Sequence, residues 1–471
     1  MEKISGSNES DLLDQVHLFF DDVSEKIEIN KGYLDFIKKA ASVLTFKLPL
    51  QRDNGELEVL EAYRVHHSFH NSPCKGGLRL SPDLDARKAE ALALITSVKM
   101  GLCDIPFGGS FGGVKCDPKK YSPNEIEKII RRYTLELAQR GFIGPAIDVP
   151  EPDLHVDTQM MSWVKSTYQL LYGNHDINAA AVCTGKAPSQ GGIEGGEGQW
   201  GKGVSHGVEA FLNLPEFSDK YDIKPGLSGK TVIFQGYGKV AYWTARYMVE
   251  AGCKIVGIVT INSAIYDKDG IDFDSASKHY LKHDTFKNYN GGKNCYEGEH
   301  SDNVLYMPCD ILVQASVEGK INMDNADKLN TKIVVEAICG ATTHSAQKIL
   351  DSKKIAVIPD LILNVGWAVS SYFEWLKNIE HVKLGRLVKG WEKANKEAIL
   401  ALVGKKPEKP ADVEGGSEED IVDAALIDVL KQTIKEVGKV SQEKGVSYRA
   451  AGYMIGLNRI YSMYKEAGFV I

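Results

Sequence analysis

The sequence lacks the features that mark several common classes of protein. It has no stretch of about 18 apolar residues, so no membrane-spanning helix is expected. Lysine and arginine form no dense stripe and the net charge is -7, which opposes binding to a phosphate backbone and makes nucleic acid an unexpected partner. The 8 cysteines have no CxxC spacing. We therefore expect no bound metal, no secreted disulfide framework and a reducing compartment.

The first residues also lack the pattern of an organelle-targeting segment. Residues 1–15 carry four acidic side chains and a single basic one, Lys3. Transit peptides have the opposite composition, rich in arginine and poor in acids. This stretch therefore gives no sign of import, and a cytoplasmic location is compatible with it.

The chain is long enough for two domains. With 471 residues, of which 43% are hydrophobic and 25% charged, it has the composition of an ordinary globular protein larger than one core usually organises. Residues 11–45 show helical periodicity, 57–69 are rich in β-formers, and 85–103 and 123–140 have helical patterns. Residues 184–204 are dominated by glycine and predict a mobile connector.

The second half of the chain predicts an α/β domain. A short apolar strand over 230–235, a helix over 239–251 and a second strand over 254–260 form a βαβ unit. Further strands are expected at 311–314, 333–336 and 356–359, which favours a parallel sheet covered on both faces. Residues 404–416 predict a loop, and Ser417 with Asp420 predicts the cap of a helix that runs to about residue 443.

From these patterns we expect three segments. Residues 1–202 would form an N-terminal domain with a mixed sheet. Residues 203–377 would form a Rossmann-type doubly wound domain, and residues 378–471 a C-terminal helical segment that packs back across the hinge. The fold class is therefore α/β.

A glycine motif stands between the first two predicted strands of the second domain. Gly236, Gly238 and Val240 belong to a Gly-x-Gly-x-x-Ala turn that follows a strand and opens a helix, where glycines let a pyrophosphate approach the helix N-terminus. The ribose-binding carboxylate should follow about 20 residues later, but Thr260 stands there and cannot accept both hydroxyls. NAD or NADP could thus bind without a predicted preference for NAD. Alternatively, the glycines serve only a tight turn.

Several strings resemble the glutamate dehydrogenase family, which belongs to the glutamate, leucine, phenylalanine and valine dehydrogenases, and specifically its animal-type hexameric class. They are 73–79 (PCKGGLR), 105–109 (IPFGG), 112–115 (GGVK), 144–150 (GPAIDVP) and 371–378 (SYFEWLKN). The resemblance covers roughly residues 45–471. Residues 404–416 fall where animal members carry an antenna, which is shortened here. Family members are hexamers and, in animals, mitochondrial, so the resemblance implies an oligomer and the mitochondrial matrix. It also implies that residues 1–202 are the substrate-binding and oligomerisation domain.

The resemblance also implies a reaction and its residues. Hydride passes between the α-carbon of glutamate and nicotinamide, giving 2-oxoglutarate and ammonia. Lys75 matches the family lysine that holds the side-chain carboxylate, and Lys99 matches the one at the α-carboxylate. Asp153 matches the acid that shuttles protons, and Ser371 matches a substrate-binding serine. Taken singly, each of these is more simply a surface lysine or a loop residue.

The sequence departs from the family where the chemistry is carried out. The family string PFGGAKxGVK has a lysine at the position of Phe111, and an aromatic ring can neither transfer a proton nor stabilise an oxyanion. Lys115 lies four residues away and could replace that lysine only after a backbone rearrangement. Trp200, Cys339 and Trp367 replace smaller or polar family residues around the nicotinamide. These changes predict a nicotinamide pocket filled by bulkier side chains.

Three hypotheses follow. The leading one is a family member with dehydrogenation lost or strongly weakened, acting as a structural, assembly or regulatory subunit in a homo- or hetero-oligomer or a larger complex. The alternative is an active NAD(P)-dependent glutamate dehydrogenase. The third is a sensor that binds glutamate or 2-oxoglutarate without oxidising it.

Overall fold

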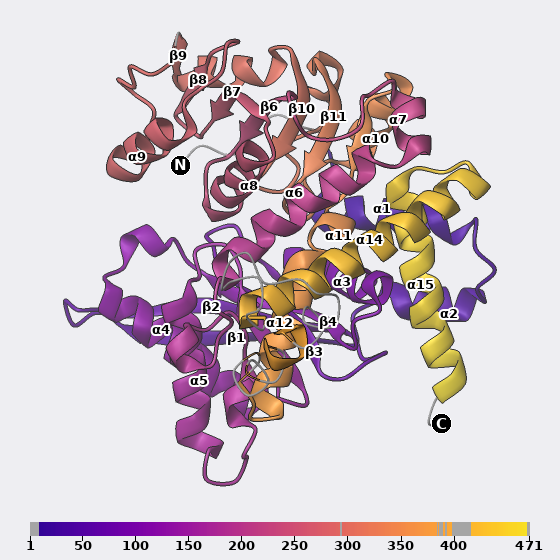
Figure 1. The fold of residues 1–471 in the computed structure, drawn as a ribbon. Coiled ribbons are helices and arrows are strands. Elements are labelled where there is room, and N and C mark those ends of the chain that lie inside the picture. The colour runs from indigo at the N-terminus through magenta and orange to yellow at the C-terminus, as the bar shows by residue number, and fades with distance from the viewer. Residues whose placement is uncertain are drawn as a thin grey trace.

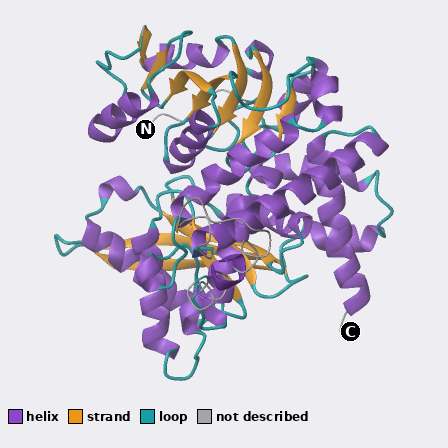
Figure 2. Ribbon diagram, viewed as in Figure 1, coloured by secondary structure: helices purple, strands orange, loops and turns teal. Residues whose placement is uncertain are grey.

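The computed structural model describes residues 9–292, 294–383, 385, 390, 393–397 and 416–468. Two β-sheets dominate it, and helices lie between and beside them (Figures 1 and 2). In Figure 1 the sheet built from the first part of the chain lies below and the later sheet lies above. The α/β class predicted from the sequence is confirmed.

The first sheet has five strands in the order β1-β2-β4-β3-β5. The strands are β1 (Ser42–Gln51), β2 (Leu57–Ser68), β3 (Cys74–Leu80), β4 (Gly108–Lys115) and β5 (Asp148–Pro152). The pairs β1–β2 and β2–β4 are antiparallel, whereas β3 pairs in parallel with both β4 and β5. The predicted mixed sheet is therefore present.

Helices cover this sheet on both faces. Helix α3 (Ala86–Cys103) covers one face, and α4 (Pro123–Gln139) and α5 (Thr158–Tyr172) cover the other. Helices α1 (Leu12–Ser24) and α2 (Lys31–Lys38) pack on α3 and α15. Helix α3 is buried nearly throughout because β2 and β4 lie against one side and the C-terminal helix α15 against another. Helix α4 begins with the predicted capping box, in which Ser122 and Glu125 accept each other's backbone N–H groups.

The second sheet has seven strands in the order β12-β11-β10-β6-β7-β8-β9. The strands are β6 (Thr231–Gln235), β7 (Lys254–Val259), β8 (Ser263–Tyr266), β9 (Asn294–Glu297), β10 (Cys309–Gln314), β11 (Thr331–Glu336) and β12 (Ala356–Ile358). From β12 to β7 the pairs are parallel, and β8 and β9 add an antiparallel edge. Helices α8 (Lys239–Glu250), α9 (Phe273–His283) and α10 (His344–Ser352) connect the strands. This is the predicted Rossmann-type arrangement.

A group of helices joins the two halves. They are α6 (Gln199–Leu212), α7 (Pro215–Tyr221), α11 (Asp360–Leu363), α12 (Val365–Ile379), α14 (Glu418–Lys444) and α15 (Tyr448–Ala467). Helix α14 packs against α6 and α12, and α15 packs against α3 and α14, so the C-terminal helices span both halves (Figure 1). The predicted Ser417 cap of α14 is present. Residues 404–415 of the predicted loop lie outside the described residues.

Two local predictions were wrong. Strand β1 already begins at Ser42, inside the segment predicted as helical, because it pairs along its whole length with β2. The glycine-rich segment was predicted as a mobile connector, yet helix α6 begins in it at Gln199. A Cβ at Gly201 would lie 2.4 Å from the Thr244 backbone nitrogen, so this glycine allows α6 to pack closely on α8. In the described part of the chain, no helix is long and apolar enough to cross a bilayer.

Candidate functional site

Strands β3, β4 and β5 bring three of the predicted site residues together. The three strands are adjacent and parallel, and residues two apart along a strand point to the same face of the sheet. Lys75 and Gly77 come from β3, Phe111 from β4, and Asp153 directly follows β5. Phe111 and Asp153 both lie beside Gly77, two residues along β3 from Lys75.

Lys75 is fully buried and already has partners. Its Nζ lies 2.6 Å from Glu151 Oε2 and donates a hydrogen bond of 2.6 Å to Thr184. The Phe107 ring lies 5.8 Å from the same nitrogen. Burial lowers the pKa of Lys75, and the Glu151 carboxylate opposes that change. Burial acts to raise the pKa of Glu151, but Lys75 and then Lys99 outweigh it and hold that pKa below its usual value.

Phe111 lies against Gly77 and Asp153. A Cβ placed on Gly77 would lie 2.4 Å from the Phe111 ring and 2.9 Å from Asp153 Cβ, so only glycine fits beneath the ring. The Arg79 guanidinium lies 5.3 Å from the ring centroid, a cation–π geometry. The aromatic side chain is 5% exposed and therefore fills this part of the cleft.

Arg79 connects the two halves of the molecule. It forms an ion pair of 2.5 Å with Asp153 beside its own sheet and one of 2.7 Å with Glu318, which follows β10 in the other half. Its side chain is 7% exposed. The guanidinium is therefore a buried link across the cleft, and it engages the carboxylate that sequence resemblance assigns to proton transfer.

Lys99 belongs to the first half of the molecule and Cys339 to the second, and the two side chains lie near each other. Lys99 is buried in α3, and no described carboxylate forms an ion pair with it. Burial opposes its charge, but nearby acidic groups, Glu151 among them, raise the pKa of Lys99. Burial also raises the pKa of the Cys339 thiol to about 12, so this group is neutral at physiological pH.

The loop that carries Cys339 is held by a buried ionic cluster. Gly340 N–H donates to Asp360 at 3.0 Å, and Thr342 N–H donates to Glu336 at 3.1 Å. Arg449 of α15 binds Glu336 at 2.7 Å and Asp360 at 3.3 Å. One arginine thus serves two buried carboxylates, and burial together with Glu336 raises the pKa of Asp360 to about 6.

This cluster predicts a specific pH dependence of stability. The folded pKa of Asp360 exceeds the unfolded value of about 3.9, so the folded state binds more protons between about pH 4 and 6. The contribution is complete below pH 4 and is lost as the pH rises through 6, a change of about 3 kcal/mol. Urea unfolding of wild type and Asp360→Asn at several pH values measures it. The difference between the two proteins should vary across this window, and parallel pH profiles would contradict the assignment.

The two tryptophans predicted to fill the nicotinamide pocket contact each other. Trp200 of α6 and Trp367 of α12 stack with centroids 4.7 Å apart and planes 8° from parallel. The indole of Trp367 also lies beside Glu151. Ser371 lies one turn further along α12, buried, and its hydroxyl donates within the helix to the Trp367 and Ala368 carbonyls. That hydroxyl can still accept a hydrogen bond.

The glycine turn lies at the carboxyl edge of the second sheet. Gly236 has φ +97°, and a Cβ there would lie 2.4 Å from the Ala315 carbonyl oxygen, so the turn requires glycine. Gly238 caps α8, and a Cβ on it would have no neighbour within 4 Å. Val240 is half-buried in the first turn of that helix. Thr260 Oγ1 donates to Ser263 O at 2.8 Å, so this hydroxyl already stabilises the turn after β7.

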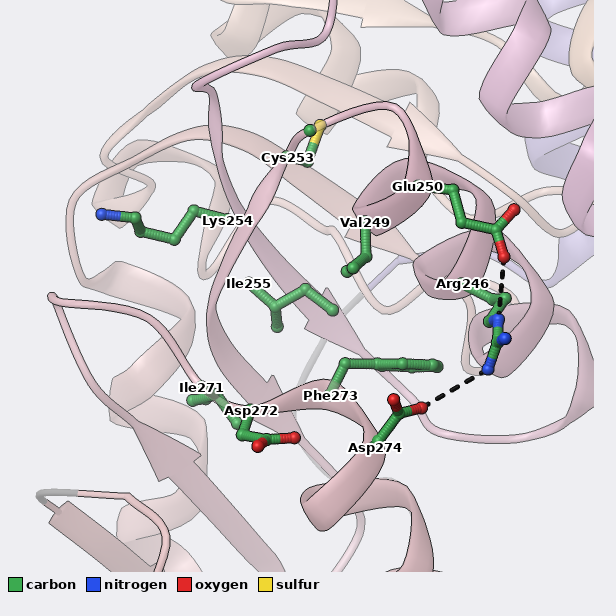
Figure 3. Close-up of a pocket in the computed structure, with 11 residues that line it drawn as sticks. Arg246, Val249, Glu250, Cys253, Lys254, Ile255, Ile271, Asp272, Phe273 and Asp274 are labelled. Carbon is green, nitrogen blue, oxygen red and sulfur yellow. Dashed lines mark hydrogen bonds and ion pairs between the residues drawn. The ribbon is translucent and has the colours of Figure 1, made fainter.

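The depression shown in Figure 3 lies away from this turn. It is lined by the end of α8, the start of β7 and the start of α9, and includes Arg246, Lys254 and Phe273. Arg246 pairs there with Glu250 and Asp274. Because the start of β7 is the opposite edge of the sheet from the glycine turn, this depression is not the dinucleotide crevice.

Lys115 does not replace the amine that the family chemistry requires. Its Nζ lies 3.6 Å from Glu61 and the side chain is 44% exposed. Three charged residues that contact the predicted site residues were not predicted: Glu151, Arg79 and Glu318. Glu151 lies two residues before Asp153, but only the parallel pairing of β5 with β3 shows that it reaches Lys75.

A mixed sheet and a Rossmann-type sheet that face each other across buried lysines define the class of two-domain amino-acid dehydrogenases. Family models agree: residues 40–170 match the dimerisation domain of Glu/Leu/Phe/Val dehydrogenases, and residues 191–399 match Glutamate/Leucine/Phenylalanine/Valine dehydrogenase. Mitochondrial glutamate dehydrogenase of Dictyostelium discoideum is 37% identical over 470 residues, covering 98% of this chain and 93% of the relative. The chain therefore belongs to the glutamate dehydrogenase family.

Other relatives carry the same family name. NAD-specific glutamate dehydrogenase of Staphylococcus aureus is 29% identical over 94% of this chain and 95% of its own length. The structure of a hetero-hexameric glutamate dehydrogenase from Thermus thermophilus (Leu bound form) matches with a TM-score of 0.81 and 25% identity over 100% of both chains. These names favour the active-enzyme alternative over loss of activity, and none of them indicates inactivity.

Proposed function

We propose that this protein binds an amino acid or the corresponding 2-oxo acid in the cleft, and that hydride transfer is lost or strongly weakened. The observation that supports the proposal is that Phe111, to which the resemblance assigns the position of the catalytic lysine, lies beside Asp153 and Arg79. Lys75, Lys99 and Ser371, which the resemblance assigns to the substrate, are all buried, and both lysines lie near Glu151.

The chemistry of these side chains gives the reason. A benzyl group has no proton to transfer, and the adjacent Arg79 guanidinium stays charged and cannot act as a base. Arg79 also forms an ion pair with Asp153. By resemblance, this carboxylate is the retained member of the catalytic lysine–aspartate pair. Loss of a general acid or base alone typically slows a reaction by about 10²- to 10⁴-fold.

One end of the predicted cofactor region suits a bound dinucleotide. The Gly236–Gly238 turn leaves open space at the N-terminus of α8, which suits the pyrophosphate of NAD or NADP. At the other end, resemblance places Trp200 where the nicotinamide amide is bound, and there the indole is stacked on Trp367. We therefore infer that a dinucleotide could be held by its phosphates without a productive position for its nicotinamide ring.

The second candidate is an active NAD(P)-dependent glutamate dehydrogenase. The names of the relatives favour it. It would need an amine beside Asp153 in place of Phe111, and Lys115 lies too far out, against Glu61. Lys99 is the remaining cleft lysine without an ion pair among the described residues, so it is the group on which this candidate would depend.

The family also supports proposals about assembly and location. We infer a division into a substrate-binding and oligomerisation domain (1–202), a dinucleotide-type domain (203–377) and a helical C-terminal segment (378–471). A hexamer, homomeric or mixed with an active subunit, follows from the family and gives an impaired subunit a regulatory or assembly role. The mitochondrial relative suggests the mitochondrial matrix.

Enzyme assays separate the two candidates. Purified protein is mixed with L-glutamate and NAD or NADP, and the absorbance of reduced nicotinamide is followed. We expect turnover well below about 1 s⁻¹, the lower end of the usual enzyme range, and faster turnover would establish the active candidate. Phe111→Lys is the companion variant: it should remain inactive because Trp200 and Trp367 still fill the nicotinamide end. Full activity in that variant would show that only the ring at 111 blocks the reaction.

A further inference from the structure

The lysine assigned to the substrate side chain is neutralised by the protein itself. Lys75 has 0% exposure, and Glu151, 6% exposed, lies 2.6 Å from its Nζ. The Thr184 hydroxyl accepts a second bond from the same ammonium group, and the Phe107 ring covers it. An incoming carboxylate would therefore have to compete with three existing neighbours.

Glu151 lies near two lysines, Lys75 and Lys99, which leaves one net positive charge among these three side chains. The further cation Lys186 is paired with Glu374 at 2.7 Å. Arg79 is paired with Asp153 and Glu318. Among the described residues, Lys99 is the cleft cation without an ion-pair partner. One unpaired cation suits one carboxylate, the α-carboxylate that every amino acid carries.

A second carboxylate at the side-chain end would be unfavourable. Placed near Lys75, it would lie close to the Glu151 carboxylate in a buried site, where like charges repel strongly. An uncharged amide or alkyl group meets no such repulsion. The amide of a glutamine side chain could also bond to the Lys75–Glu151 pair.

We propose that Glu151 is a specificity-determining residue, and that the cleft selects monocarboxylic amino acids with uncharged side chains, or their 2-oxo acids, over glutamate and 2-oxoglutarate. This inference rests on the proposed function, because it concerns the ligand of the same cleft. It goes beyond the proposed function by specifying that the side chain of the ligand is uncharged.

Calorimetric titration of the full-length protein with isosteric ligands tests the proposal. L-Glutamine and L-glutamate differ only at the side-chain terminus, and L-norvaline supplies a linear apolar side chain. We expect wild-type protein to bind glutamine or norvaline about 10-fold or more tightly than glutamate. In Glu151→Gln, which keeps the size of the side chain and removes its charge, glutamate affinity should rise by about 10- to 100-fold, because one nearby charge typically changes a local equilibrium by about 1–3 powers of ten.

A matched control keeps the result specific. Glu125→Gln removes a buried carboxylate at the start of α4 and should leave the preference unchanged. Circular dichroism shows whether Glu151→Gln is folded, and the wild-type comparison stands even where that variant is not. Glutamate binding as tight as glutamine binding in wild type, or no gain in folded Glu151→Gln, would overturn the inference but leave the proposed function intact. Absence of binding by all three amino acids would overturn both.

Discussion

Replacing Arg64 with methionine is expected to lower the free energy of unfolding by about 3–5 kcal/mol, because it leaves a buried carboxylate without its cation. Arg64 and Asp148 both have 0% side-chain exposure and form a two-bond pair of 2.6 and 2.7 Å. The same guanidinium donates to Ser110 and to the Gly77 carbonyl. These contacts hold β3 and β4 next to the position of Phe111.

Chemical denaturation of wild type and variant measures this loss. The double variant Arg64→Met/Asp148→Asn removes both charges and should be more stable than Arg64→Met alone, since the single change leaves the uncompensated charge. Arg131→Met, which breaks an exposed pair with Glu127, should have little effect. A loss of less than about 1 kcal/mol in Arg64→Met would falsify the assignment of a buried, stabilising pair.

Arg79→Met should produce the second large effect. The guanidinium is the shared partner of Asp153 and Glu318, so the substitution leaves two mostly buried carboxylates facing each other. We expect a loss of about 3 kcal/mol in the free energy of unfolding. Since these carboxylates belong to opposite halves of the molecule, their repulsion should also widen the cleft.

Two measurements together distinguish this role from a purely local one. Denaturation reports the loss of stability, and small-angle X-ray scattering reports the separation of the two halves. Arg79→Lys keeps the charge but not the two-sided geometry, and should fall between wild type and Arg79→Met. An unchanged scattering profile in folded Arg79→Met would show that the link does not hold the cleft closed.

The fold could be predicted well wherever local patterns decide it. The helix that starts at Pro123 was predicted from its capping residues, and the turn at Gly236 from its glycines, because both depend on neighbouring residues alone. Strand β4 was not predicted, since its glycines are poor strand formers. Gly112 stands there because a Cβ would lie 2.2 Å from the Tyr63 carbonyl oxygen, a constraint set by a distant strand.

The candidate site was predictable in its residue types but not in its pairings. Resemblance drew attention to Lys75, Phe111 and Asp153, which lie in or directly after the adjacent strands β3, β4 and β5. The resemblance gave no indication that Glu151 would form an ion pair with Lys75. Nor did it indicate that Arg79 would link Asp153 to Glu318 in the opposite half. Such contacts depend on strand order and domain closure, which no spacing along the chain encodes.

The parallel stack of Trp200 and Trp367 has an optical consequence. Two indoles stacked at 4.7 Å in nearly parallel planes couple their electronic transitions, and they lie on α6 and α12, the helices that run between the halves. Ultraviolet circular dichroism of such a pair depends steeply on its separation. The protein therefore carries an intrinsic chromophore pair that reports the geometry of its own cleft without any attached label.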